Sequence, residues 1–308
     1  MKRGLIAWDK TDLPPEAFEA RLASVRHTMA ARGLHALLVY SDVWQSNLGR
    51  YFSNFMPYWN RALIVIPAVV VPAMEKPVLL CSLSPRVYPW IKTVTIFDEI
   101  KPSPNLAQRV FAMCAEKGWK KIGAMGAFPY DLDQALRAGE VAVESVNAPP
   151  PSDEWALSLY RRAAALAREG LQAELSGAAV GLPGHEFVAR LEHRYRRAGA
   201  EDLVILFSNG AAPPAPASAA PLSAVFSAAV ALEYRGHWVK IVRNHPGLTG
   251  PAASYRKESL SGPYPYESTD PPEQPGVIFA VRTEIQRNAA RLFHGDSYVQ
   301  TDSGAELL

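Results

Sequence analysis

The N-terminal half of the chain alternates helical patterns of apolar residues with short, almost uninterrupted apolar runs. Residues 14–33 carry apolar side chains at intervals of three or four, namely Phe18, Leu22, Val25 and Met29. Similar spacing predicts helices at residues 104–118 and 129–138. Apolar runs predict strands at residues 35–41, 61–67, 76–82, 92–98, 120–126 and 140–146. This alternation predicts a layered α/β domain with a mixed, mostly buried sheet.

A proline-rich segment, NAPPPSD at residues 147–153, interrupts this pattern. Such a stiff, polar segment is typical of a linker, so we expect one domain at 1–150 and a second at 151–308. The second domain opens with a long amphipathic helix at residues 155–178. A Pro-Gly loop and another helix, which ends near Arg197, follow it.

The rest of the second domain is predicted to be mainly β-structure. Residues 225–243 form two apolar runs around a turn at Tyr234, Arg235 and Gly236. Residues 276–308 are predicted to form a strand, a turn, a strand and a final turn at Ser303 and Gly304. The domain therefore belongs to the α+β class.

Composition narrows the classes of partner and compartment. The 308 residues include 32 basic and 30 acidic side chains and carry a net charge of +2, so electrostatics give no reason to expect a nucleic acid or a membrane as partner. No N-terminal stretch resembles a signal peptide and no apolar run approaches about 18 residues, so we expect a cytoplasmic protein. Cys81 and Cys114 lack the spacing of a metal site and are expected in the core.

Three segments together resemble the creatinase, aminopeptidase P and prolidase family. They are EYRGHWVKIVR, which ends at Arg243, the closing GDSYVQTDSGAELL, and NLGRYFSNF at residues 47–55. The resemblance implies a creatinase-like α/β N-terminal domain and a pita-bread C-terminal domain. The latter would be shortened in its centre, because only about thirty residues separate Arg243 from Val277. It also implies a homodimer, since relatives dimerise.

The resemblance implies a metal centre that this sequence does not preserve. Most members of the family bind two divalent cations through two Asp, one His and two Glu. The two Asp positions correspond to Ala229 and Lys240 here, and the two Glu positions to Arg282 and Gly295. The segment that should supply the His is missing. The sequence therefore predicts no metal and no cofactor, unless the alignment is shifted so that Glu233, Glu284 or Asp296 takes a ligand position.

Charge reversal at two of these positions suggests a different ligand. If Lys240 and Arg282 point into the former metal pocket, an anion or a leftover carboxylate must accompany them, because burying a lone charge is costly. One hypothesis is a carboxylate- or phosphate-bearing ligand bound by Lys240, Arg282 and Arg243. The alternative is that these cations pair internally with Glu or face solvent.

The aromatic stretch at residues 43–61 allows two interpretations. Tyr51 and Trp59 belong either to an aromatic wall for a ligand or dimer contact, or to a packed loop under the sheet.

The function that the sequence favours is a metal-free pseudo-peptidase that binds a small molecule, a peptide or a partner protein. One alternative is a metal-independent hydrolase of C–N bonds, or a lyase, that uses His237, Glu233 or Asp296. A second alternative is a structural subunit with the aromatic residues 44–59 as its contact surface. A decayed gene product with a deleted centre is a further alternative.

Overall fold

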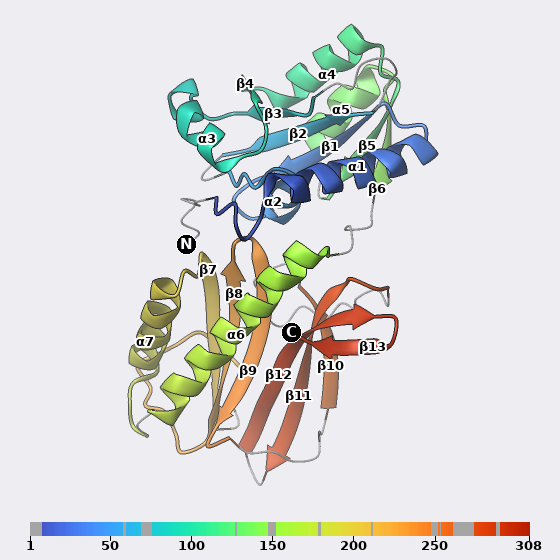
Figure 1. Cartoon of the computed structure of the whole chain (residues 1–308). Coiled ribbons are helices and arrows are strands. Elements are labelled where there is room, and N and C mark those ends of the chain that lie inside the picture. Colours follow the sequence, from blue (N-terminus) through green and yellow to red (C-terminus); the bar gives the residue numbers. More distant parts are fainter. Residues whose placement is uncertain are drawn as a thin grey trace. The chain divides into compact units, whose positions relative to one another are not determined.

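The computed structural model describes residues 8–57, 60–68, 76–126, 128–146, 152–177, 180–210, 212–247, 252, 254–260, 274–287 and 290–308. The chain divides into two compact units, Lys2–Pro150 and Pro151–Leu308 (Figure 1). No helix within the described ranges is long and apolar enough to cross a membrane.

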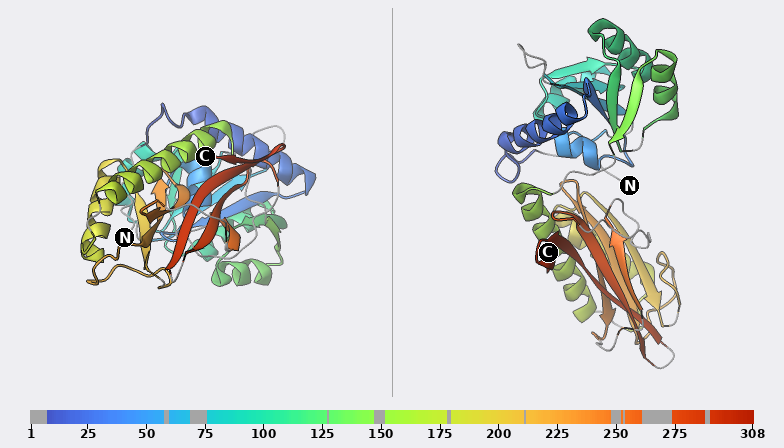
Figure 2. Two further views of the ribbon diagram at one scale, coloured as in Figure 1. Left: turned by 90° about the horizontal axis from the view of Figure 1, so that it is seen from below. Right: turned by 90° about the vertical axis from the view of Figure 1, so that its right-hand side faces the viewer.

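The N-terminal unit is a mixed six-stranded sheet between two layers of helices (Figures 1 and 2). The strand order is β4-β3-β2-β1-β5-β6, with antiparallel pairs β1/β2 and β2/β3 and parallel pairs elsewhere. The strands are β1 (Ala36–Ser41), β2 (Ala62–Pro67), β3 (Val78–Cys81), β4 (Glu99–Pro102), β5 (Lys121–Met125) and β6 (Ala142–Val146). The helices are α1 (Pro15–Ala31), α2 (Asn47–Ser53), the 3-10 turn η1 (Pro85–Val87), α3 (Tyr88–Val94), α4 (Leu106–Lys117) and α5 (Tyr130–Ala138).

Each face of this sheet has its own core. Helices α1, α2 and α3 pack with alternate strand residues such as Leu37 and Ile64. Helices α4 and α5 pack with the intervening residues such as Leu38 and Leu63. This division follows from the period of two in a strand, because successive side chains point to opposite faces. The predicted α/β architecture of the unit is confirmed.

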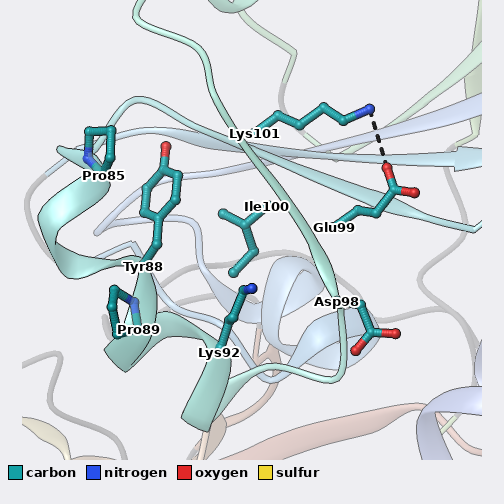
Figure 3. A pocket seen from close by; sticks show the side chains of 8 residues that line it. All are labelled: Pro85, Tyr88, Pro89, Lys92, Asp98, Glu99, Ile100 and Lys101. Atoms are coloured by element: carbon teal, nitrogen blue, oxygen red, sulfur yellow. Dashed lines mark ion pairs between the residues drawn. The ribbon is translucent and has the colours of Figure 1, made fainter.

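One predicted strand is wrong. Residues 92–98 do not form a strand; helix α3 ends at Val94, and β4 begins only at Glu99. Proline at the second position of α3 favours the start of a helix. Ile91 and Val94 then bury side chains three residues apart, as one face of a helix does. Helix α3 and β4 border a groove at the edge of the sheet (Figure 3).

The C-terminal unit is a curled antiparallel sheet with two helices. The sheet order is β10-β11-β12-β9-β8-β7, and β13 pairs with β12. Its elements are α6 (Glu154–Ser176), α7 (Gly184–Arg197), β7 (Asp202–Asn209), β8 (Phe226–Tyr234), β9 (His237–His245), β10 (Ser254–Ser259), β11 (Ile278–Arg287), β12 (Ala290–Thr301) and β13 (Gly304–Leu307). The turn between β8 and β9 has positive φ at Arg235 and Gly236, which matches a two-residue hairpin turn. Strands β7 and β10 have no counterpart among the predicted elements.

The two faces of this sheet have different neighbours. Helix α6 lies across one face, which we call the helix face (Figures 1 and 2). On it, Arg162 of α6 stands over the ring of Tyr234, and Tyr160 meets His237 edge-on. The opposite face, which we call the inner face, carries the alternate residues. It includes Ala229, Val242 and Phe293, which pack on one another although β8 and β12 are not adjacent strands. The sheet therefore curls around its inner face.

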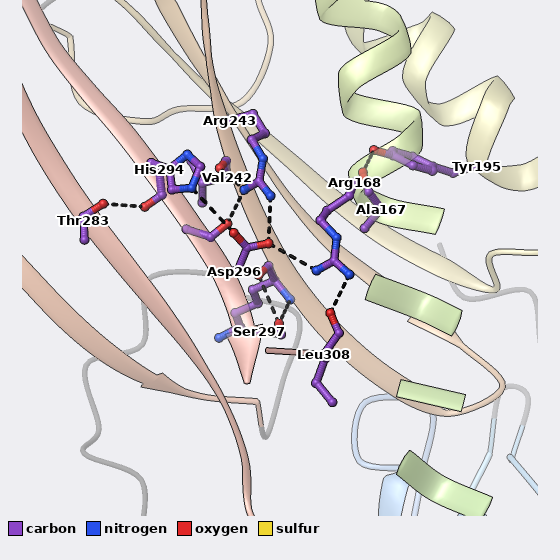
Figure 4. Close-up of polar contacts among 12 residues, drawn as sticks. Ala167, Arg168, Tyr195, Val242, Arg243, Thr283, His294, Asp296, Ser297 and Leu308 are labelled. Atoms are coloured by element: carbon purple, nitrogen blue, oxygen red, sulfur yellow. Dashed lines mark hydrogen bonds and ion pairs between the residues drawn. The ribbon is translucent and has the colours of Figure 1, made fainter. Parts of the chain in front are cut away.

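A buried carboxylate joins α6 to the sheet on the helix face (Figure 4). Asp296 of β12 accepts a hydrogen bond of 2.8 Å from Arg243 of β9, and Arg168 of α6 lies 3.3 Å from the same oxygen. His294 Nε2 lies 3.6 Å from the other oxygen. Burial raises the pKa of Asp296, but the contacts with His294 and Arg243 lower it more. The net pKa is therefore below its ordinary value of 3.8.

We predict that Asp296→Asn destabilises the C-terminal unit by about 3 kcal/mol, because it leaves two arginines around an uncharged group. Since the pKa of Asp296 is lowered by folding, its contribution is present above pH 3.8 and is lost as the pH falls through the lower, folded value. Urea unfolding at a series of pH values should show the full difference in unfolding free energy between the unmodified protein and Asp296→Asn near neutrality. Below pH 3.8 this difference should shrink.

The matched control is Glu306→Gln, which removes the exposed ion pair with Arg161 and should cost less than about 1 kcal/mol. Equal stability of the Asp296→Asn variant and the unmodified protein at pH 7 would contradict the assigned role of this carboxylate.

Candidate functional site

The four positions that the resemblance assigns to metal ligands, Ala229, Lys240, Arg282 and Gly295, lie together on the inner face. In the pairing register Ala229 stands opposite Val242, Val242 opposite Gly295, and Gly295 opposite Arg282. Lys240 lies two residues from Val242 and therefore faces the same side. The sheet thus brings the four positions into one neighbourhood, as a shared ligand site requires.

The residues at these positions do not fit a pair of divalent cations. Lys240 and Arg282 are cationic, and Ala229 has no ligand atom. At Gly295, a Cβ atom would lie 2.6 Å from the carbonyl oxygen of Val281, so a carboxylate there would require the backbone to move. Nowhere in the described ranges do three or more His, Cys, Asp or Glu side chains gather in a metal-binding group. Hard cations need such anionic oxygen ligands.

Arg282 is placed beside an acidic residue on the neighbouring strand. Its guanidinium lies 3.5 Å from Glu258 of β10, and it stands over the ring of Phe293 at 5.6 Å. Glu258 is only 2% exposed. Glu258 is therefore the internal partner that one of the two alternatives requires for Arg282. That partner was missed because β10 lies in the Pro-, Ser- and Tyr-rich centre, which shows no strand pattern.

Other charged residues of the inner face include Lys240, Glu233 and Glu284, and each contacts or packs among other residues of the sheet. Lys240 is 2% exposed, and its backbone N–H and C=O bond to the Ser297 hydroxyl at 2.9 and 3.1 Å. Glu233 lies on the same face and is completely buried. Glu284 accepts two hydrogen bonds from Arg291, at 2.8 and 3.0 Å. The inner face therefore combines cations and carboxylates, of which Lys240 and Glu233 are buried and the Arg291–Glu284 pair is partly exposed.

The remaining candidates of the C-terminal unit lie on the helix face. Arg243 and Asp296 bind each other there, so Asp296 is not among the carboxylates that accompany Lys240 and Arg282. His237 Nδ1 lies 2.9 Å from the carbonyl oxygen of Arg235. Of the three catalytic candidates, His237 and Asp296 thus face one side of the sheet and Glu233 the other. The structure does not assemble them into one site.

The aromatic candidates belong to the N-terminal unit. Residues Asn47–Ser53 form helix α2, in which Tyr51 is half-buried and its ring lies 4.2 Å from the guanidinium carbon of Arg21. Phe52 and Phe55 are buried in the core, as the packed interpretation requires, whereas Trp44 is 77% exposed. Trp59 lies outside the described residues.

Comparison with known proteins identifies the fold. No family description and no curated protein sequence matches the chain. Among solved structures, the prolidase from Pyrococcus horikoshii OT3 aligns with a TM-score of 0.71 at 13% identity, covering 94% of this chain and 97% of that one.

Two further structures give the same result. The Xaa-Pro dipeptidase from Bacillus anthracis has a TM-score of 0.71 at 15% identity, with coverages of 94% and 97%. The X-Pro aminopeptidase from Thermotoga maritima MSB8 has a TM-score of 0.72 at 14% identity, with coverages of 93% and 96%. The chain therefore has the two-unit, creatinase-like pita-bread fold of the prolidases, Xaa-Pro dipeptidases and Xaa-Pro aminopeptidases.

Proposed function

We propose that this chain is a metal-free pseudo-peptidase, which keeps the peptidase fold and acts by binding rather than by metal-dependent hydrolysis. One observation carries the proposal. Ala229, Lys240, Arg282 and Gly295 converge on the inner face, where relatives would hold two metals, and they supply no anionic ligand. Two metal ions activate water and stabilise the transition state only when carboxylates and imidazoles hold them. Two cationic side chains at these positions would repel them instead.

We further propose that the inner face binds a small ligand that carries a carboxylate or a phosphate. Arg256 and Arg282 stand directly opposite each other in β10 and β11, and like charges in that arrangement destabilise a sheet. An anion between them offsets this repulsion, and Glu258, two residues from Arg256, is an internal anion in reach of Arg282. An anionic ligand would exchange with the Glu258 carboxylate and bind Arg282 bidentately.

A metal-independent hydrolase or lyase is less well supported. His237 would have to act as a proton shuttle, but its ring meets Tyr160 on the helix face. Glu233 lies on the opposite face, and Asp296 is engaged by two arginines. General acid–base catalysis needs such groups within hydrogen-bond reach of one substrate.

A metal-free pseudo-peptidase should neither retain a metal nor hydrolyse the substrates of prolidases. After incubation with Mn²⁺ and gel filtration, elemental analysis should find no stoichiometric metal, and Xaa-Pro dipeptides should not be hydrolysed above the buffer rate. The Pyrococcus horikoshii prolidase, treated in parallel, is the positive control. Stoichiometric metal together with hydrolysis would overturn the pseudo-peptidase proposal.

Binding of a carboxylate or phosphate at the inner face should stabilise the C-terminal unit. Citrate or phosphate should raise the melting temperature of the C-terminal unit, by an amount that corresponds to about 2.7 kcal/mol at one hundred times Kd. Arg282→Met and Lys240→Met should reduce this shift, because each removes a charge while keeping much of the side-chain volume. Glu258→Gln should increase anion affinity, because it removes the internal competitor.

Arg161→Ala is the matched control, since Arg161 is exposed on α6 and should not affect the shift. Succinate and inorganic phosphate, titrated separately, distinguish a carboxylate site from a phosphate site. An equal shift in the Arg282→Met variant and the unmodified protein would exclude the inner face as the binding site.

A further inference from the structure

The N-terminal unit has an open groove between an outer strand and a helix, remote in sequence from the inner face. It has a volume of about 660 Å³ and is lined by Pro85, Tyr88, Pro89, Lys92, Asp98, Glu99, Ile100 and Lys101 (Figure 3). One wall is α3 with the preceding turn, and the other is β4. Because β4 is the last strand in the sheet order, one of its edges has no strand neighbour among the residues that the structure describes.

The free edge of β4 offers backbone hydrogen-bonding groups to a further strand. The N–H of Ser103 donates to the carbonyl oxygen of Cys81 at 2.9 Å, so the residues with odd numbers point their backbone groups toward β3. Backbone groups alternate sides along a strand. The N–H and C=O of Ile100 therefore point outward, away from β3. Pro102 limits this edge, since it has no N–H.

The side chains beside this edge form an apolar floor with fixed geometry. Ile100 is half-buried, and Figure 3 shows it between Tyr88 and Lys92. The Tyr88 hydroxyl lies 3.3 Å from the carbonyl oxygen of Cys81 and 3.4 Å from that of Leu83, which holds the ring in place. Pro85 and Pro89 add rigid apolar surface. A side chain of an added strand would find an apolar contact here.

Three of the four charged side chains that line the groove are in ion pairs, and the fourth, Lys92, can contact a bound partner protein. Asp98 pairs with Lys76 at 3.1 Å, and Lys101 pairs with Glu99 at 3.2 Å. Lys92 is exposed and forms no ion pair with any residue in the described part of the chain. Charge complementarity therefore favours an acidic residue opposite Lys92.

We propose that this groove binds an extended, acidic peptide segment of a partner protein, which adds to β4 as a seventh strand. In this recognition mode main-chain hydrogen bonds supply affinity, and side-chain pockets supply specificity. Ile100 provides the main-chain bonds, the groove between Tyr88 and Ile100 takes an apolar side chain, and Lys92 selects an acidic one. The site uses no residue of the inner face, so it is independent of the anion proposal.

The test uses two fluorescein-labelled hexapeptides, one of alternating Glu and Val and one of alternating Lys and Val, in fluorescence anisotropy with the full chain. The acidic peptide should bind at least about tenfold more tightly than the basic one. Lys92→Glu should reverse this preference. Lys117→Glu, an exposed charge change on α4, is the matched control and should leave it unchanged.

Two further measurements separate strand addition from simple charge attraction. N-methylation of alternate peptide bonds in the acidic peptide should abolish binding, because it removes the donors that a strand needs. Hydrogen exchange should show the amide of Ile100 protected by the unmodified peptide. Equal binding of both peptides, or of the N-methylated one, would overturn the proposal. A change from dimer to monomer in the Lys92→Glu variant would also overturn it, by identifying a second copy of this chain as the occupant.

Discussion

The antiparallel register of the C-terminal sheet is the constraint on which the arrangement of its side chains depends. The register places Ala229 opposite Val242 and Arg282 opposite Gly295. Because side chains alternate between faces, these pairs also decide which face each remaining residue of the four strands occupies. A slip of one residue would move Lys240 and Arg282 to the side of α6 and would bring Asp296 inward. The register thus separates Lys240 and Arg282 from the Asp296 cluster.

Small residues and hydroxyl groups allow the sheet to curl around the inner face. Phe293 donates its backbone N–H to the hydroxyl of Ser227 at 2.9 Å, although their strands are not adjacent. The Ser297 hydroxyl bonds both backbone groups of Lys240 on β9, the adjacent strand, which pairs with β12 at Gly295 and Val242. These hydroxyls replace ladder hydrogen bonds where strands separate, so buried backbone groups stay satisfied. At Gly295 the backbone of β11 leaves no room for a side chain, because a Cβ atom would lie 2.6 Å from the carbonyl oxygen of Val281.

The two proposed binding sites lie in different units of the chain. The C-terminal unit has the fold of the peptidases, and its inner face carries the ion pairs Arg282–Glu258 and Arg291–Glu284. The N-terminal unit presents a strand edge whose short length and terminal proline limit nonspecific pairing. Both proposals describe binding, and each relies on residues of one unit only.

The sequence by itself determined most local elements and the resemblance that identifies the fold. Periodicity found helices α1, α4, α5, α6 and α7 and the hairpin of β8 and β9, because these signals lie within a few neighbouring residues. The framing motifs around Gly236 and the final turn identified the fold, and the resemblance they carry assigns the ligand positions to Ala229, Lys240, Arg282 and Gly295. These conclusions need residue identities and spacing alone.

Only the tertiary structure decided which residues meet. Strands β7 and β10 are defined by their pairing with β8 and β11, and the sequence pattern does not predict them. The pairing of β10 with β11 places Glu258 beside Arg282. Asp296 was grouped with the inner carboxylates by its proximity in sequence, whereas the register places it under α6 with Arg168 and Arg243. Helix α3, which overlaps the predicted strand at residues 92–94, likewise buries Ile91 and Val94 against the core. In each case the deciding contact joins residues far apart in the chain, and local patterns carry no information about such partners.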